Sequence, residues 1–369
     1  MDSNHFNIIE ISDIHFGNGR VSPELILSHL EKYLYPELKN IDLLVINGDT
    51  FDTLLNMNSS AGWHAARFID DVTTLALENQ FYIRVVRGTF SHDRNQNQFF
   101  TVRGKDQLVL NNKPQIVVYT GLAIENFGNH NFLFCPDNLP YKDLTQEILD
   151  KIDAYHLNHV DCIFSHGYYN HLLPENLPHI PTDTISWDRI KTKVSGYCVN
   201  GHVHHMGVHD RVISSGSFER MEHGVTEKVG FWKVSYSGTW SATFVENKDS
   251  VAFRTFYPME YESDEGIKNA MIGYIQKLYS EGYDKCAPIY IRLMGKDPGI
   301  LLSIKETYPC VVTSVKAPKA LQEEPELSDT LYEELPEITE DNLPVLIYQQ
   351  LEDRNLFTEE EIKDLINAL

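Results

Sequence analysis

The chain has 369 residues, of which 42% are hydrophobic, enough to bury the core of one large domain and one or two smaller modules. This composition excludes a wholly disordered chain, and no run of about 18 apolar residues predicts a membrane-spanning helix. The formal net charge of −22 excludes a uniformly basic, nucleic-acid-binding surface. The charge is uneven, however: residues 323–364 hold 15 acidic and two basic residues, a net of −13, which leaves −9 elsewhere.

The N-terminal residues contain neither the basic region nor the apolar core of a signal peptide, so we expect a cytoplasmic protein. The five cysteines are scattered and form no Cys-x-x-Cys pair. We therefore expect them to be reduced and mostly buried rather than to form disulfides or a zinc site.

Short apolar runs alternate with helical patterns in the first half of the chain, which predicts an α/β core. The expected helices cover Pro23–Leu38, Trp63–Glu78 and Leu144–Tyr155. The expected strands are Phe6–Ser12, Asp42–Gly48, Tyr82–Gly88, Ile116–Gly121, Asn131–Pro136 and Val160–His166.

From Gly196 to Pro258 the pattern consists of strands alone, which suggests a second sheet that closes the same domain. We therefore expect a first domain over residues 1–258. A mixed pattern over 259–317 predicts a small α+β module, and the Glu- and Pro-rich residues 318–342 predict a solvated linker. Residues 343–369 have two apolar stripes at helical spacing, which predicts a helical pair. Because two short helices cannot bury such stripes alone, they need either the core or a partner protein, and we expect a partner.

Five short polar clusters stand out, and four of them directly follow a predicted strand. In α/β folds the loops at the carboxyl ends of strands assemble the functional site. The clusters are Asp13-Ile14-His15, Gly48-Asp49, Ser91-His92-Asp93, Ser165-His166-Gly167 and Gly201-His202-Val203-His204.

The spacing within these clusters favours metal binding. Residues i and i+2 of an extended chain point the same way, so an Asp-x-His or His-x-His pair can converge on one ion. Mixed carboxylate and imidazole ligands suit manganese, iron or zinc better than magnesium or calcium. Each cluster alone is a weak signal, but their order along the chain is hard to obtain by chance.

That order resembles the calcineurin-like metallophosphoesterase superfamily, and within it the SbcD-type nucleases, bacterial and phage relatives of the eukaryotic meiotic-recombination nuclease. Further similarities are the Asn47–Asp52 stretch, Asn-Gly-Asp-Thr-Phe-Asp, and the run from Ser214 to Trp232 after the last histidine pair. The resemblance implies a two-sheet sandwich flanked by helices, with a capping domain over 259–317 and a partner-binding helical tail over 343–369.

The resemblance also implies the roles of the cluster residues. Asp13, His15 and His204 would hold one divalent ion, His166 and His202 would hold another, and Asp49 would bridge both. The expected cofactors are thus two divalent metal ions, with Mn²⁺ the expected identity. His92 would protonate the leaving oxygen or position the phosphate, and Asp93 would orient His92.

One motif departs from the family. The usual Gly-Asn-His-Asp is replaced by Gly88-Thr89-Phe90-Ser91-His92-Asp93, so the Asn ligand of the second ion is missing. Ser91 is the expected replacement in the aligned position, and Thr89 or Asn95 could substitute through a rearranged loop. We expect two metal sites of unequal affinity.

By this resemblance the chain would be a DNA exonuclease and endonuclease, the nuclease subunit of a DNA repair or recombination complex. Its expected partners are DNA, an SbcC-type coiled-coil ATPase bound through the C-terminal helices, and a second copy of the chain in a homodimer. No membrane association is expected. The alternatives are a small-molecule phosphoesterase of the same superfamily and a catalytically weak, metal-bound scaffold for the ATPase.

Overall fold

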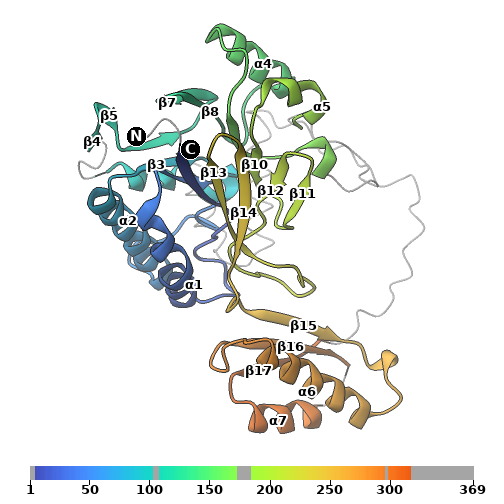
Figure 1. The fold of residues 1–369 in the computed structure, drawn as a ribbon. Coiled ribbons are helices and arrows are strands. Elements are labelled where there is room, and N and C mark those ends of the chain that lie inside the picture. Colours follow the sequence, from blue (N-terminus) through green and yellow to red (C-terminus); the bar gives the residue numbers. More distant parts are fainter. Residues whose placement is uncertain (1–4, 103–107, 173–183, 296–297, 317–369) are drawn as a thin grey trace, which may run out of the picture. The chain divides into compact units, whose positions relative to one another are not determined.

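Parallel strands from the first half of the chain form the centre of a six-stranded sheet (Figure 1). The computed structural model describes residues 5–102, 108–172, 184–295 and 298–316. The sheet order is β14-β13-β1-β2-β3-β6, with β13 antiparallel to β1 and to β14. Its strands are β1 (Phe6–Ile11), β2 (Leu43–Asn47), β3 (Tyr82–Val86), β6 (Ile116–Tyr119), β13 (Gly230–Tyr236) and β14 (Trp240–Glu246).

A second six-stranded sheet has the order β11-β12-β10-β9-β8-β7 and antiparallel pairs at its two edges. Its strands are β7 (Ala123–Phe127), β8 (His130–Cys135), β9 (Cys162–His166), β10 (Cys198–Gly201), β11 (Gly207–His209) and β12 (Val212–Ser214). A separate hairpin joins β4 (Val109–Leu110) to β5 (Lys113–Pro114).

The two sheets pack face to face, and helices cover their outer faces. Successive residues of β1 divide between these layers: Ile8 packs between the sheets, and Ile9 packs towards the helices. Helices α1 (Pro23–His29) and α2 (Ser60–Asn79) cover the first sheet, while α4 (Leu144–Ala154) and α5 (Trp187–Ile190) cover the second. The expected α/β sandwich of two sheets flanked by helices is therefore confirmed.

Arg84 links the two sheets through a buried ion pair. Its guanidinium group, on β3, donates to both carboxylate oxygens of Glu125 on β7, at 2.5 and 2.7 Å. It also donates to three backbone carbonyls, so the buried charge is fully paired.

The sequence suggested that the strands after Gly196 form one sheet, but they do not. Strands β10 and β12 join the second sheet, whereas β13 and β14 join the first. The strand at Val251–Tyr257, expected in the same sheet, is β15 (Ala252–Phe256) and pairs with β16 (Ile289–Met294). Strand pairing is a tertiary choice that the local apolar pattern of a strand cannot specify.

A small parallel sheet, β15-β16-β17, follows the sandwich, with β17 at Val311–Lys316. Helices α6 (Asp264–Ser280) and α7 (Pro298–Thr307) connect its strands and pack on one face. The expected α+β character of this module is thus present. The predicted linker (318–342) and helical tail (343–369) lie outside the described residues.

The predicted helix Pro23–Leu38 is only partly α-helical. Ser22 caps α1, which gives way to a π-helical turn at Leu30–Leu34 and a 3₁₀ segment at Tyr35–Asn40. Pro36 has no N–H group to continue an α-helix, which accounts for the tighter segment.

Two further expectations concern the cysteines and membrane-spanning helices. Cys135, Cys162 and Cys198 are buried and unbridged, as expected for reduced thiols. Among the described helices, none combines the length and apolar character needed to cross a membrane.

Candidate metal centre

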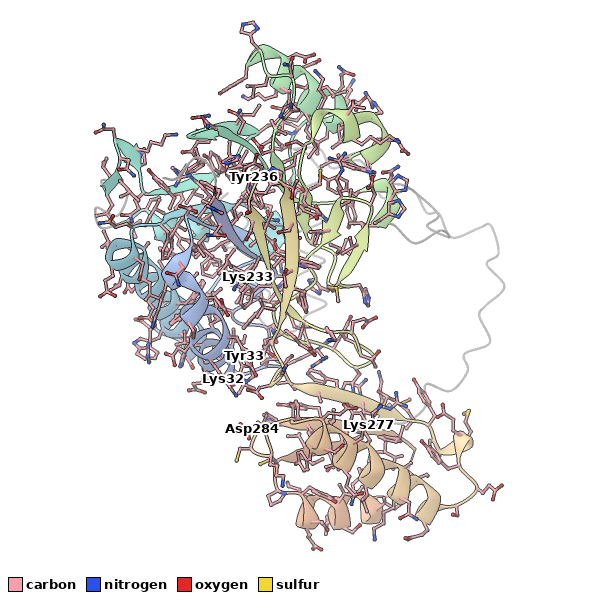
Figure 2. The ribbon with its side chains drawn as sticks, viewed as in Figure 1. Lys32, Tyr33, Lys233, Tyr236, Lys277 and Asp284 are labelled. Carbon is pink, nitrogen blue, oxygen red and sulfur yellow. The ribbon has the colours of Figure 1, made fainter. Side chains whose placement is uncertain are left out.

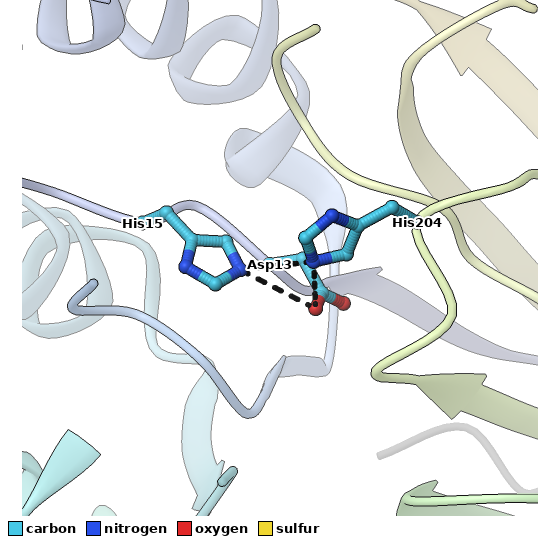
Figure 3. Close-up of side chains that lie close together, drawn as sticks. All are labelled: Asp13, His15 and His204. Carbon is cyan, nitrogen blue, oxygen red and sulfur yellow. Dashed lines mark hydrogen bonds and ion pairs between the residues drawn. The ribbon is translucent and has the colours of Figure 1, made fainter. Parts of the chain in front are cut away.

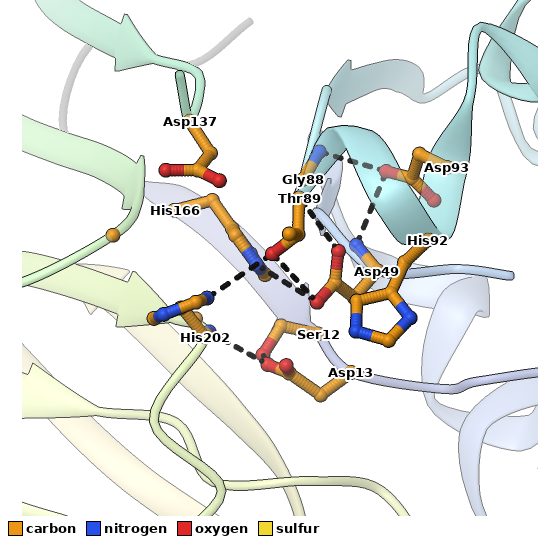
Figure 4. A network of polar contacts seen from close by, with 12 residues as sticks. Ser12, Asp13, Asp49, Gly88, Thr89, His92, Asp93, Asp137, His166 and His202 are labelled. Atoms are coloured by element: carbon orange, nitrogen blue, oxygen red, sulfur yellow. Dashed lines mark hydrogen bonds and ion pairs between the residues drawn. The ribbon is translucent and has the colours of Figure 1, made fainter. Parts of the chain in front are cut away.

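Six predicted ligands come together where strands of the two sheets end (Figures 3 and 4). Because the carboxyl ends of parallel strands lie at one edge of a sheet, each strand delivers its ligand to the same region. Asp13 and His15 follow β1, Asp49 follows β2, His166 ends β9, and His202 and His204 follow β10.

The backbone that carries these ligands is not extended, contrary to the expectation from their spacing. Asp13, His15 and Asp49 have φ angles of 51°, 52° and 46°, and His202 has a φ of 81°. Such left-handed conformations cost a non-glycine residue roughly 1–3 kcal/mol and concentrate at functional sites. The ligands therefore converge through tight turns rather than through strand alternation.

The first cluster contains Asp13, His15 and His204 (Figure 3). The Nε2 atoms of His15 and His204 are 3.1 Å apart, and His204 Nε2 lies 3.3 Å from Asp13 Oδ1. Asp13 Oδ1 is buried and has no hydrogen-bond partner in the described structure. Two ring nitrogens and a carboxylate oxygen thus point at one place, as ligands of a cation do.

The second cluster contains Asp49, His166 and His202 (Figure 4). The Nδ1 atom of His166 donates to the backbone carbonyl of Asn47 at 2.8 Å, since a carbonyl can only accept. This contact directs Nε2 of His166 at Asp49 Oδ2, 3.2 Å away. Holding one ring nitrogen by a carbonyl is the usual way to orient a metal-binding histidine.

The two clusters adjoin, because His15 Nε2 lies 3.9 Å from Asp49 Oδ2. Buried His and Asp groups with mutually facing lone pairs fit two divalent cations, as the sequence predicted in general terms. The mixed nitrogen and oxygen ligands are compatible with manganese, iron or zinc.

The close approach of histidines and carboxylates also shifts their pKa values. Burial lowers the pKa of His15, but Asp13 and Asp52 outweigh burial and raise it to about 9. Burial likewise opposes protonation of His166, yet Asp49 raises its pKa to about 10. The pKa of Asp13 falls well below its usual value, because His15 and His204 outweigh the effect of burial. The nearby carboxylates thus favour the protonated form of both histidines at neutral pH.

The third motif is arranged differently from the expectation. Ser91, the expected replacement for the missing Asn, lies exposed on α3 (Phe90–Asp93). Thr89 occupies the second cluster instead: its Oγ1 atom is 3.2 Å from both Asp49 Oδ2 and His202 Nδ1. Its backbone N–H also donates to Asp49 at 2.6 Å. The sequence analysis had named Thr89 only as a substitute through a rearranged loop, and its position directly after Gly88 could have indicated it.

His92 lies beside the first cluster, as its predicted role requires. Its Nδ1 atom donates to the backbone carbonyl of Asp52 at 2.6 Å, and its ring meets the ring of His15 edge-on. One ring nitrogen of His92 lies within 4.8 Å of a ring nitrogen of His15 and of a carboxylate oxygen of Asp49. His92 also lines an open cleft of about 300 Å³ together with His204.

Asp93 does not orient His92, and that expectation is wrong. Its buried carboxylate accepts from the backbone N–H groups of Gly88 and Asp49, at 2.7 and 3.2 Å, and from Asn97 Nδ2 at 2.7 Å. Burial raises the pKa of Asp93 to about 6. Asp93 therefore ties the loop after β3 to the loop that carries Asp49.

Three residues of the site were missed in the sequence. Asp52 lies 3.1 Å from His15 Nδ1, and its position at the end of Asn-Gly-Asp-Thr-Phe-Asp could have indicated it. Glu10, a lone acid in an apolar strand, is buried beneath the site, and burial raises its pKa to about 7. Asp137 follows β8 and lies buried near His166 and His202 (Figure 4).

Comparisons with known proteins add little to this geometry. No protein-family model and no curated protein matches the chain. GAP50, described as the anchor in the inner membrane complex of Plasmodium, is 15% identical, with 67% of this chain and 86% of that chain covered and a TM-score of 0.39. A cold-active protein-tyrosine phosphatase of a psychrophilic Shewanella is 15% identical, with 64% and 80% covered and a TM-score of 0.30. Similarity at this level carries no conclusion about the activity of this chain.

Proposed function

We propose that the chain is a metal-dependent phosphodiesterase of the calcineurin-like metallophosphoesterase kind, and that its substrate is DNA. The observation that carries the proposal is the pair of adjoining, buried His/Asp clusters beside His92. Asp13 Oδ1 and His166 Nε2 are buried, and their close contacts are ion pairs with His204 at 3.3 Å and with Asp49 at 3.2 Å. Both atoms would be satisfied as ligands of a cation.

The residues of the two clusters would hold two divalent cations. Asp13, His15 and His204 would hold one, and Asp49, His166 and His202 would hold the other, with Asp49 close enough to serve both. When bound, such ions activate a water nucleophile and stabilise negative charge on the attacking and leaving oxygens.

The side chains around the clusters would position the phosphodiester and move a proton. Because Nδ1 of His92 donates to the Asp52 carbonyl, a neutral His92 has no proton on Nε2. The doubly protonated ring would give its Nε2 proton to the leaving oxygen and become neutral. Arg20 lines the same cleft and is about 60% exposed, in a loose ion pair of 3.7 Å with Glu222. Its guanidinium would exchange this exposed partner for a phosphate oxygen. The carboxylates of Asp13 and Asp49 would repel a phosphodiester unless cations neutralised them.

We propose, more specifically, that the chain is an SbcD-type nuclease. This assignment rests on the order of the motifs and on the α+β module after the sandwich. An SbcC-type ATPase would bind the tail at residues 343–369, and a homodimer would be the working unit. Bound divalent cations would locally offset part of the net charge of −9 that lies outside residues 323–364.

Cleavage assays test the proposal directly. The purified chain is incubated with Mn²⁺ and end-labelled duplex or single-stranded DNA, and in parallel with bis-(p-nitrophenyl) phosphate. We expect cleavage of DNA and of the diester, reduced roughly 10²–10⁴-fold in His92→Gln. The matched control is His209→Gln, an exposed histidine outside the clusters, which should cleave as the unaltered chain does.

The outcomes separate the alternatives. Hydrolysis of p-nitrophenyl phosphate without cleavage of either diester would favour a small-molecule phosphomonoesterase and overturn the nuclease. Tight metal binding without hydrolysis of any substrate, with or without an ATPase partner, would leave the metal-bound scaffold.

A further inference from the structure

A second cavity lies away from the metal clusters. This groove, of about 690 Å³, is formed by one side of α6, by β15, and by the segments around Arg220 and after β14. Its volume falls in the range typical of sites for small ligands. None of its lining residues lines the cleft at His92. We call it the α6 groove.

Cations gather in the α6 groove although the chain as a whole is strongly acidic. Five basic residues and two acidic ones line it. The acids are already paired, since Lys228 Nζ is 3.0 Å from Glu246 and Lys277 Nζ is 3.9 Å from Glu281 (Lys277 is labelled in Figure 2). The three basic residues without an acidic partner among the described residues are Arg220, Lys248 and Arg254.

Arg220 and Arg254 line the α6 groove together with Tyr274. The guanidinium groups of Arg220 and Arg254 both lie near enough to Tyr274 to oppose the rise that burial causes in its pKa. Arg220 donates hydrogen bonds from Nε to the carbonyl of Glu227 and from Nη1 to the carbonyl of Ser250, and these bonds fix its position. Like charges held in a partly enclosed groove repel one another, so an anion between them is favoured.

Half-buried tyrosine rings accompany the cations. Tyr261 and Tyr274 line the groove, and both are partly exposed. A tyrosine ring offers a stacking surface for a planar base, whereas an arginine fork suits phosphate oxygens.

Arg292, on the neighbouring strand β16, projects from the face of the small sheet opposite to the α6 groove. In the register of β15 and β16, Arg254 pairs with Ile291 and Thr255 pairs with Arg292. Ile291 packs into the core under α6, so Arg254 and Arg292 project from opposite faces.

We propose that the α6 groove binds a nucleoside polyphosphate, with its phosphates on Arg220, Lys248 and Arg254 and its base against Tyr261 or Tyr274. This site is independent of the proposed hydrolytic activity and requires no metal ion.

Fluorescence anisotropy of N-methylanthraniloyl-ATP with the full chain tests the site. EDTA in the buffer prevents phosphate from binding through ions at the metal clusters. We expect saturable binding that weakens with ionic strength, is displaced by ATP, and is displaced much less well by pyrophosphate or adenosine. Arg254→Gln and the exposed Lys248→Glu should each weaken binding by at least about tenfold.

Two matched variants serve as controls, and thermal melts confirm that every variant is folded. Arg292→Gln removes an arginine from the opposite face of the same sheet, and Lys268→Glu reverses a charge on α6 outside the groove. Both should bind as the unaltered chain does. Absence of saturable binding, or equal binding by Lys248→Glu and Lys268→Glu, would overturn the site. Equal displacement by pyrophosphate and ATP would overturn the nucleotide as its ligand.

Discussion

Two histidines of the metal centre hold their protons unusually firmly. The pKa of His15 is raised to about 9 and that of His166 to about 10, chiefly because nearby carboxylates outweigh burial. In the metal-free chain these raised values stabilise the fold fully below pH 6.5, the ordinary histidine value. That contribution is lost as the pH rises through 9 and 10.

Metal binding must displace these protons. Affinity should therefore rise with pH from neutrality until the pH passes 9 to 10, and each binding event should release protons. Calorimetric titration with Mn²⁺ in two buffers of different ionisation enthalpy counts the protons released. Binding that is independent of pH over this range would contradict the assignment of His15 and His166 as ligands.

Thr89 faces Asp49 and His202 in the second cluster, where its hydroxyl could serve as a ligand. A hydroxyl is a weaker ligand than an amide carbonyl, so the second cluster should bind its ion less tightly than the first. Thr89→Val should weaken that site further, whereas Thr89→Asn should tighten it. Electron paramagnetic resonance titration with Mn²⁺ resolves the two affinities.

Ser91→Ala is the matched control, because Ser91 is exposed and should leave both affinities unchanged. Two equally tight sites in the unaltered chain, or an effect of Ser91→Ala as large as that of Thr89→Val, would refute the role of Thr89.

At the level of elements, the loops after β2 and β3 fit together with little space. A Cβ atom on Gly88 would lie 2.2 Å from the backbone nitrogen of Asp49 and 2.3 Å from its Oδ1. Asp93 joins the same two loops by accepting from the N–H groups of both Gly88 and Asp49. The position of Asp49, the proposed bridging ligand, thus depends on a neighbouring loop.

Gly88→Ala should therefore displace Asp49. We expect a loss of roughly 1–3 kcal/mol in the free energy of unfolding from overpacking, and a loss of metal affinity at both clusters. Urea denaturation and metal titration measure the two effects. Gly121→Ala, where a Cβ would meet nothing within 4 Å, should change neither. A Gly88→Ala variant with full metal affinity would show that the loops have room to adjust.

For the whole molecule, the described residues that form the metal clusters all lie between 13 and 204, and the tail at 343–369 lies far along the chain. Removing residues 343–369 should leave metal binding and diester hydrolysis intact but abolish association with an SbcC-type ATPase. Co-purification and metal titration of the truncated and full chains test this. Loss of metal binding on truncation would show that the tail belongs to the fold of the centre.

The sequence by itself predicted most strands and helices of the sandwich, though not β7, β11 or α5, and it predicted the six residues that gather in the two clusters. Both depend on local patterns. An apolar strand such as β1 and a pair such as His202 and His204 can be recognised within a few residues. Only the tertiary structure decided which strands share a sheet, that β15 belongs with β16, and that Thr89 rather than Ser91 faces Asp49. These outcomes depend on contacts between segments tens of residues or more apart, and such contacts leave no periodic signal in the chain.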